Sequence, residues 1–223
     1  MKRLLCVLLC FVLLCPVAAR AETGTVALTF DDGPSGRFTR ALLEGLEQRQ
    51  VKATFLLCGY RLKDYPKEAM QILANGHEIG LHGYSHDPMD KMSRRELEQE
   101  LRDNLALLPE GCDPVFLRAP GGACSQLVRD TARDFGLAVL NWSVDPRDWA
   151  TRDAGAITAM VIDNVRDGDV ILLHDMSDSS VEAALAIIDR LKAQGFRFVT
   201  VTELAQQKNV SIEPGKEYFC FGK

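Results

Sequence analysis

The sequence lacks several features that mark common protein classes. It has no cluster of Lys or Arg, and its formal net charge is −5, so neither nucleic acid nor anionic lipid is an expected partner. No two cysteines have the C-x-x-C spacing that is typical of thiolate zinc sites. No internal repeat, low-complexity tract or linker divides the chain, and its 223 residues therefore predict one domain with a full hydrophobic core.

One long apolar run is present, and it lies at the amino terminus. Two basic residues precede apolar residues 4–17, and Ala-Arg-Ala follows at 19–21. This order predicts a secretory signal peptide cut after Ala21, because the run is too short for a usual membrane span. An uncleaved membrane anchor is the alternative; lipid attachment at Cys15 is disfavoured because the large Leu14 precedes it. We expect a secreted or cell-wall-associated protein with no membrane attachment after cleavage, and a net charge that changes from −5 to −8.

Hydrophobic patterning over residues 22–223 predicts strands that alternate with helices. The expected strands are residues 25–28 with their continuation into 29–31, 53–57, 78–81, 115–117, 137–140, 169–173 and 196–199. The expected helices are residues 38–46, 67–73, 93–108, 125–135, 157–165, 180–193 and 202–207, with a tail at 208–223. Such alternation implies parallel strands covered by helices. The predicted fold is a single α/β domain, a distorted or incomplete (β/α) barrel of about seven parallel strands.

Four cysteines remain after the predicted cleavage, Cys58, Cys112, Cys124 and Cys220. An even number in an exported protein permits disulfides, with three possible pairings of all four. We expect the pair Cys112–Cys220, because Cys112 precedes a strand at the end of the barrel that a returning tail can reach. Cys58 and Cys124 follow strands, at the opposite end.

Two adjacent carboxylates end the first strand. Residues 29–34, Thr-Phe-Asp-Asp-Gly-Pro, place Asp31 and Asp32 immediately before a strong turn signal. Side chains alternate along a strand, but at its end two neighbours can turn toward one pocket. Carboxylates there cost free energy unless a cation, a basic partner or several donors receive them. An ordinary turn in which Asp caps backbone amides is the alternative.

Two histidines four residues apart follow a later strand. His82 and His86 come just after residues 78–81, and in a helix or a turn this spacing brings both rings to one face. With Asp32 as third ligand, one carboxylate and two imidazoles suit a catalytic divalent ion, zinc first and cobalt second. A surface coincidence is the alternative reading of the pair.

Five segments, taken together and in this order, resemble the motifs of the polysaccharide deacetylase family. This family comprises the metal-dependent carbohydrate esterases with a NodB-homology domain (carbohydrate esterase family four). The five segments are residues 29–34, 82–86, 118–122, 145–149 and 172–174. One such segment alone is a weak signal, whereas five in the family's order are specific.

The resemblance implies that Asp32, His82 and His86 hold one divalent metal ion. It implies that Asp31 is the general base that takes a proton from the attacking water, and that Arg118 keeps Asp31 anionic and oriented. Without the resemblance, a surface salt bridge is the simpler reading of Arg118.

The resemblance also implies roles on the opposite side of the site. His174 is the general acid for the departing sugar nitrogen, and Asp148 pairs with it. The main-chain amide of Gly121 stabilises the oxyanion, and Trp149 and Leu172 wall a pocket for the acetyl methyl group. The simpler readings are a buried core histidine for His174 and core packing for Trp149 and Leu172.

The chain departs from the family pattern at two positions. Position 83 is Gly where a Ser or Thr usually braces the metal loop, and this departure predicts a looser loop. Position 121 is Gly where an aromatic residue is common, which removes one wall of the sugar site but keeps the main-chain donor. His77 matches no motif, and we expect it at the start of a strand or behind the ligands.

The resemblance implies a secreted, monomeric deacetylase that removes N-acetyl groups from an aminosugar polymer, peptidoglycan first and chitin-type oligosaccharide second. The alternatives are an O-acetyl esterase acting on a xylan-type glycan and a catalytically silent glycan-binding protein on the same fold. Silent members are expected to lose Asp31 or His174, and both are present here.

Overall fold

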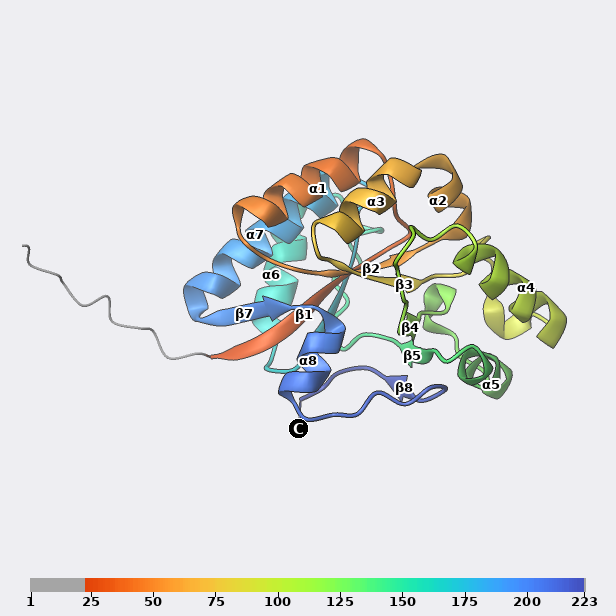
Figure 1. Cartoon of the computed structure of the whole chain (residues 1–223). Coiled ribbons are helices and arrows are strands. Elements are labelled where there is room, and N and C mark those ends of the chain that lie inside the picture. Colours follow the sequence, from red (N-terminus) through yellow and green to blue (C-terminus); the bar gives the residue numbers. More distant parts are fainter. Residues whose placement is uncertain (1–22, 223) are drawn as a thin grey trace, which may run out of the picture.

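The computed structural model describes residues 23–222 and shows a curled parallel sheet surrounded by helices (Figure 1). The predicted signal peptide, residues 1–21, lies outside the described residues. The strands are β1 (Gly24–Asp31), β2 (Thr54–Leu57), β3 (Glu78–Leu81), β4 (Phe116–Leu117), β5 (Ala138–Leu140), β6 (Val170–His174), β7 (Phe196–Val199) and β8 (Glu217–Tyr218). The helices are α1 (Arg37–Gln48), α2 (Gly59–Asp64), α3 (Pro66–Ala74), α4 (Arg94–Leu105), α5 (Gln126–Asp134), α6 (Ala154–Asn164), α7 (Asp178–Gln194) and α8 (Val201–Gln207), with short 3-10 turns η1 (Met89–Lys91) and η2 (Pro120–Gly122).

Every strand pairing in the described sheet is parallel, in the order β6-β1-β2-β3-β4-β5-β8. β7 pairs with the first half of β1 and β6 with the second half, where Asp31 lies opposite His174. Between β5 and β6 a single bridge, from Val144 to Ile171, takes the place of a ladder. The predicted fold, an incomplete (β/α) barrel of about seven parallel strands, is therefore confirmed, with the two-residue β8 as an addition.

Side-chain alternation along β1 determines what enters the barrel. Phe30 points outward and packs in a large apolar cluster with residues of α1, α3, α6 and α7. Ala27 points the other way and packs with Leu204 of α8, in a cluster that also contains inward residues of β2, β4, β5 and β6. Helix α8 and the tail lie at one end of the curl (Figure 1). Thr29 and Asp31 point inward like Ala27 but lie further along β1, toward the other, open end of the barrel, where the strands terminate.

Apart from the two short 3-10 turns, two elements of the structure were not predicted from the sequence. The six-residue helix α2 begins directly after β2, and β8 has only two residues, so neither presents a periodic pattern of useful length. β8 pairs with β5, with Glu217 opposite Val139. The helix expected over 93–108 ends at Leu105, with its predicted capping box formed by Ser93 and Glu96.

The predicted Cys112–Cys220 disulfide is wrong. All four cysteines in residues 23–222 are free. The tail does return to the start of a strand, but that strand is β6. The backbone of Cys220 forms an antiparallel β-bridge with the backbone of Asp169, the residue before β6. Cys112, between α4 and β4, packs instead against the outer apolar cluster of the sheet.

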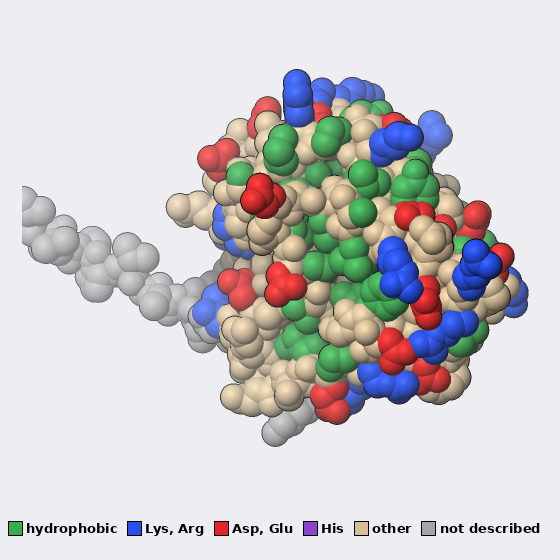
Figure 2. Space-filling model, turned by 45° about the vertical axis from the view of Figure 1, so that its right-hand side comes forward, with side chains coloured by type: hydrophobic (Ala, Val, Ile, Leu, Met, Phe, Trp, Pro, Cys, Tyr) green, Lys and Arg blue, Asp and Glu red, His purple; other side chains and the backbone are tan. Residues whose placement is uncertain are grey.

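The described residues contain no membrane-spanning helix, and the face shown in Figure 2 carries no patch of a single charge sign. No helix in residues 23–222 is long and apolar enough to cross a membrane. Figure 2 shows basic and acidic side chains interspersed with apolar ones.

Candidate active site

The two adjacent aspartates line one cavity at the open end of the barrel. Asp31 continues the inward alternation of β1, whereas Asp32 has a φ of 68°, in the left-handed region. This backbone turn brings the second carboxylate back to the side that the first one faces. Both aspartates line a cavity of about 380 Å³, a size typical of small-ligand sites.

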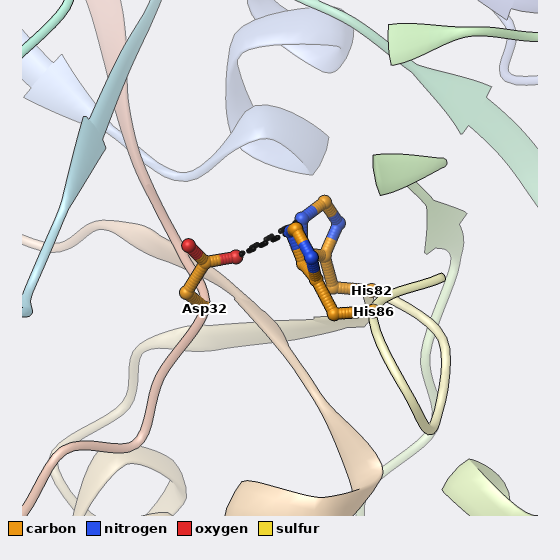
Figure 3. Close-up of side chains that lie close together, drawn as sticks. All are labelled: Asp32, His82 and His86. Carbon is orange, nitrogen blue, oxygen red and sulfur yellow. Dashed lines mark ion pairs between the residues drawn. The ribbon is translucent and has the colours of Figure 1, made fainter. Parts of the chain in front are cut away.

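Asp32, His82 and His86 converge at this cavity (Figure 3). The Oδ1 atom of Asp32 lies 3.3 Å from Nε2 of His82 and 3.1 Å from Nε2 of His86. One ligand atom from each of the three residues lies within 4.8 Å of the others. The Nδ1 atom of His82 donates to the carbonyl oxygen of Arg118 at 2.8 Å, which leaves the Nε2 lone pair free to face Asp32.

This arrangement fits a bound cation. Oδ1 of Asp32 is buried, and no hydrogen bond satisfies it within the described chain. Burial alone would raise the pKa of Asp32, but the neighbouring imidazoles of His82 and His86 outweigh burial and hold this pKa well below its usual range. An ionised carboxylate and two imidazole nitrogens with open positions form the donor set of a catalytic zinc or another first-row ion.

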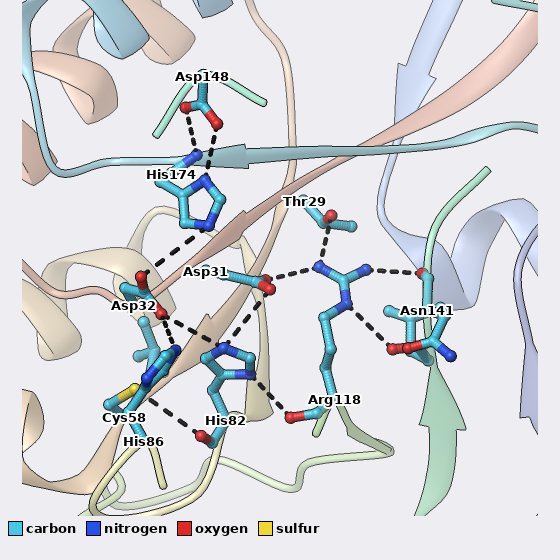
Figure 4. Close-up of polar contacts among 12 residues, drawn as sticks. Thr29, Asp31, Asp32, Cys58, His82, His86, Arg118, Asn141, Asp148 and His174 are labelled. Carbon is cyan, nitrogen blue, oxygen red and sulfur yellow. Dashed lines mark hydrogen bonds and ion pairs between the residues drawn. The ribbon is translucent and has the colours of Figure 1, made fainter. Parts of the chain in front are cut away.

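Asp31 lies beside this triad but has a partner of its own (Figure 4). Its Oδ1 accepts a hydrogen bond from Nη1 of Arg118 at 2.6 Å, and Arg118 is fully buried. The same guanidinium donates to Oγ1 of Thr29 and to the carbonyl oxygens of Leu140 and Asn141, at 2.9 to 3.0 Å. The simpler reading of Arg118 as a surface salt bridge is therefore wrong, since its charge is neutralised and hydrogen-bonded inside the barrel.

His174 faces the triad from β6 and is held by Asp148. Its Nδ1 lies 2.7 Å from Oδ1 of Asp148, and its backbone amide donates to Oδ2 of Asp148 at 2.9 Å. Burial works against the charged imidazole, but Asp148 more than compensates and the pKa of His174 rises to about 9. Nε2 of His174 points toward Asp32, at 4.0 Å from its Oδ2. A protonated nitrogen is thus available in the cavity at neutral pH.

The remaining predicted residues form the walls. Gly121, Trp149 and Leu172 line the same cavity as the triad. Trp149 is 62% exposed, so it is not a core residue, whereas Leu172 is buried. Gly121 has a φ of 67°, and a Cβ built on it would meet nothing within 4 Å, which leaves its main chain open to a ligand.

His77 lies outside the site, directly before β3. Its Nδ1 accepts a hydrogen bond from the amide of Ala53 at 3.2 Å, and its ring meets Phe55 edge to face. The expected position at the start of a strand is what the structure shows, since His77 precedes Glu78, the first residue of β3.

Sequence reasoning missed several residues that line or support the site. Trp142 and Asp145 line the cavity. They lie in or next to the fourth motif segment, which was the available signal. Glu100 contacts the loop between the two histidines from α4, and the sequence gives no sign of this because α4 reads as a solvent-exposed helix with many charges.

Comparison with known proteins agrees with this geometry. The family model for polysaccharide deacetylase matches residues 18–140. The chain is 39% identical over 190 residues to a peptidoglycan-N-acetylglucosamine deacetylase of Bacillus cereus, covering 82% of this chain and 89% of that protein. The chain belongs to the polysaccharide deacetylase family, as its five motif segments predict.

Two further relatives define the extent of the similarity. The peptidoglycan-N-acetylglucosamine deacetylase PgdA of Listeria monocytogenes is 36% identical over 207 residues. That match covers 92% of this chain but only 43% of the Listeria protein, so the chain spans less than half of that relative. A family 4 acetyl xylan esterase from Clostridium thermocellum, solved with a cobalt ion, superposes with a TM-score of 0.82 at 35% identity, over 88% of this chain and 98% of that one.

Proposed function

We propose that this chain is a metal-dependent hydrolase that removes N-acetyl groups from an aminosugar polymer, with peptidoglycan as first substrate and chitin-type oligosaccharide as second. One observation carries the proposal. Asp31 and His174 reach the cavity from paired positions of β1 and β6, beside the triad of ligands but each bound to a separate partner. A base and an acid are thus available in addition to the metal ligands.

Asp32, His82 and His86 would hold the ion, with zinc as first choice and cobalt as second. The ion would supply Lewis-acid polarisation of the acetyl carbonyl and a lowered pKa for the attacking water. The position of His82 is maintained by the Arg118 carbonyl, which fixes its tautomer.

The residues of the chain then account for each proton. The Asp31 carboxylate takes a proton from water while the water oxygen bonds to the acetyl carbon. The main-chain amide of Gly121 donates to the oxygen that becomes negative. Protonated His174 gives its Nε2 proton to the sugar nitrogen, the carbon–nitrogen bond breaks, and acetic acid and a free amine leave. Asp31 then loses the proton it took and His174 regains one, both by exchange with solvent, and the acetic acid ionises to acetate.

Arg118 and Asp148 prepare these two groups without touching the substrate. Arg118 stabilises ionised Asp31 inside the barrel at 2.6 Å, and this form is the one that can accept a proton. Asp148 stabilises protonated His174, which is the form that can donate. Trp149 and Leu172 would flank the acetyl methyl group.

We also propose that residues 1–21 direct export, so that the domain meets the cell wall. The order of basic, apolar and small residues at 2–21 supports this proposal, as does similarity to relatives named as peptidoglycan deacetylases. Cell fractionation with an antibody against the domain tests it.

Acetate release from a panel of glycans tests the proposed activity. The panel contains peptidoglycan, N-acetyl chitooligosaccharide and acetylated xylan, each assayed with added zinc, added cobalt and a chelator. Release from the aminosugar substrates that is lost with chelator and restored by metal supports the proposal. Preference for acetylated xylan supports the O-acetyl esterase instead, and binding of all three glycans without turnover supports a silent binder.

A further inference from the structure

The loop that joins His82 to His86 is held from outside by helix α4. Oε2 of Glu100 accepts hydrogen bonds from the backbone amides of Tyr84, at 2.7 Å, and Ser85, at 2.9 Å. These two amides lie between the two histidines in sequence. A single carboxylate oxygen on α4 therefore binds the middle of the segment that carries both imidazoles.

Other contacts hold the carbonyl groups of the loop. The amide of Gly59 donates to the carbonyl oxygen of Gly83 at 2.9 Å, and the amide of Tyr60 donates to that of Tyr84 at 3.0 Å. The carbonyl of Gly83 also accepts from the side-chain amide of Asn104, one helical turn after Glu100. Carbonyls of the loop thus face α2 and Asn104, and its amides face Glu100.

Glu100 also occupies space that a side chain at position 83 would need. A Cβ built on Gly83 would lie 2.7 Å from Cε of Met89 and 3.2 Å from Oε2 of Glu100, and Gly83 has a φ of 77°. A glycine at position 83 was predicted to loosen the loop. The carboxylate of Glu100, from α4, offsets this effect because it accepts hydrogen bonds from the loop amides.

The conformation of the loop needs such support. His86 has a φ of 68°, which a residue with a Cβ adopts only at some cost in free energy. His86 is also the less buried ligand, since its side chain is 42% exposed against 3% for His82. Packing alone therefore does little to keep its Nε2 aimed at Asp32.

We propose that Glu100 is a positioning residue of the metal site: by fixing the amides of Tyr84 and Ser85 it holds His86 in register with His82 and so sets the affinity for the divalent ion. This inference rests on the metal site of the proposed function. In this inference Glu100 acts by accepting hydrogen bonds that position the loop, and not by attraction between its negative charge and the ion.

Zinc titration of the metal-free protein, followed calorimetrically in the absence of substrate, tests the inference. Glu100→Ala should weaken zinc binding by about 10–100-fold, the usual cost of removing a residue that supports a metal ligand. Glu100→Gln should keep wild-type affinity, because its amide oxygen can accept from the same two amides. Glu98→Ala is the matched control and should leave zinc affinity unchanged. It removes a carboxylate from the same helix, and within residues 23–222 this carboxylate forms ion pairs with Arg94 and Arg102 and none with the histidine loop.

Three results would overturn the inference. Equal affinities of Glu100→Ala and Glu98→Ala would show that the contact does not set metal binding, even if Glu100→Ala lowers the melting temperature of the metal-free protein. Equal losses in Glu100→Gln and Glu100→Ala would show that charge, not position, matters. Wild-type protein that binds no zinc would contradict the metal site itself, which is the separate failure of the proposed function.

If Glu100→Ala does not fold, Glu100→Asp takes its place, since its shorter side chain cannot reach both amides and should weaken zinc binding.

Discussion

Nη1 of Arg118 lies 2.6 Å from Oδ1 of Asp31, and the side chains are 0% and 4% exposed. Burial lowers the pKa of Arg118 and Asp31 opposes that effect, so the two charges depend on each other inside the barrel. The pair therefore links the stability of the fold to the chemistry of the site, because the arginine that neutralises the base also donates to two backbone carbonyls.

Replacing this arginine should be costly for folding. Arg118→Met leaves Asp31 buried without its partner, and we expect the free energy of unfolding in urea to fall by about 3–5 kcal/mol. The control is Arg102→Met, which removes an arginine 60% exposed from an i,i+4 pair with Glu98 and should cost about 0–1 kcal/mol. Similar losses for both variants would contradict the role given to the buried pair.

Zinc should stabilise the protein through the three proposed ligands. At a free zinc concentration of about 100 times the dissociation constant, linkage predicts about 2.7 kcal/mol of added stability, reversed by a chelator. His86→Ala removes a ligand that is partly exposed, and this variant should fold but gain almost nothing from zinc. Thermal unfolding with and without metal measures both effects. An undiminished gain in His86→Ala would place the ion elsewhere.

The pH dependence of stability should carry the signature of His77. Burial, and after it the charge of Lys52, lowers the pKa of His77 from 6.5 to about 4. As pH falls below 6.5 the unfolded chain takes up a proton that the native state refuses until about pH 4, so this group's contribution to stability is present above 6.5 and is lost between these values. The difference corresponds to about 3 kcal/mol.

Metal-free protein provides the measurement for His77. Urea unfolding of the wild type and of His77→Gln at pH 7 and pH 4 should show the advantage of the wild type shrinking by about 3 kcal/mol. The comparison of two proteins is needed because Asp175, whose pKa is raised to about 7 by burial, titrates over the same range with the opposite sign. Parallel curves for the two proteins would contradict a buried, neutral His77.

Much of the site could be predicted from the sequence because it lies at strand ends. Asp31, His82 and His174 each follow or end an apolar run, and parallel strands end on the same side of a barrel. The sequence contains the turn signal that follows Asp32 but not the backbone conformation of Asp32, whose φ of 68° lets both carboxylates face one cavity. That conformation depends on the fold around it and has no pattern in the residues themselves.

The elements that the sequence did not predict depend on contacts distant in the chain. β8 is a strand only because two residues of the tail pair with β5. The contact of Glu100 with the histidine loop joins residues 15 and 16 positions apart, on a helix whose charges otherwise read as solvent-exposed. The wrong disulfide has the same origin: the tail returns as expected, but beside Asp169 and not beside Cys112.

The loss of turnover in His174→Ala should depend on how much the leaving group needs protonation. An amine must be protonated to depart, whereas an activated phenolate leaves unaided, so His174→Ala should lower turnover of N-acetyl chitooligosaccharide far more than that of an aryl acetate. Steady-state rates on the two substrates give the ratio. Equal losses on both would assign His174 to a role other than proton donation.

Separation of the base from the metal is the central claim, and Asp31→Asn tests it most directly. Acetate release from N-acetyl chitooligosaccharide or peptidoglycan and zinc affinity are measured on the same preparation of this variant, and its zinc binding also shows that it is folded. We predict that turnover falls by about 10²–10⁴-fold while zinc affinity stays near that of the wild type. Turnover equal to that of the wild type, or loss of zinc binding by folded protein, would contradict the account.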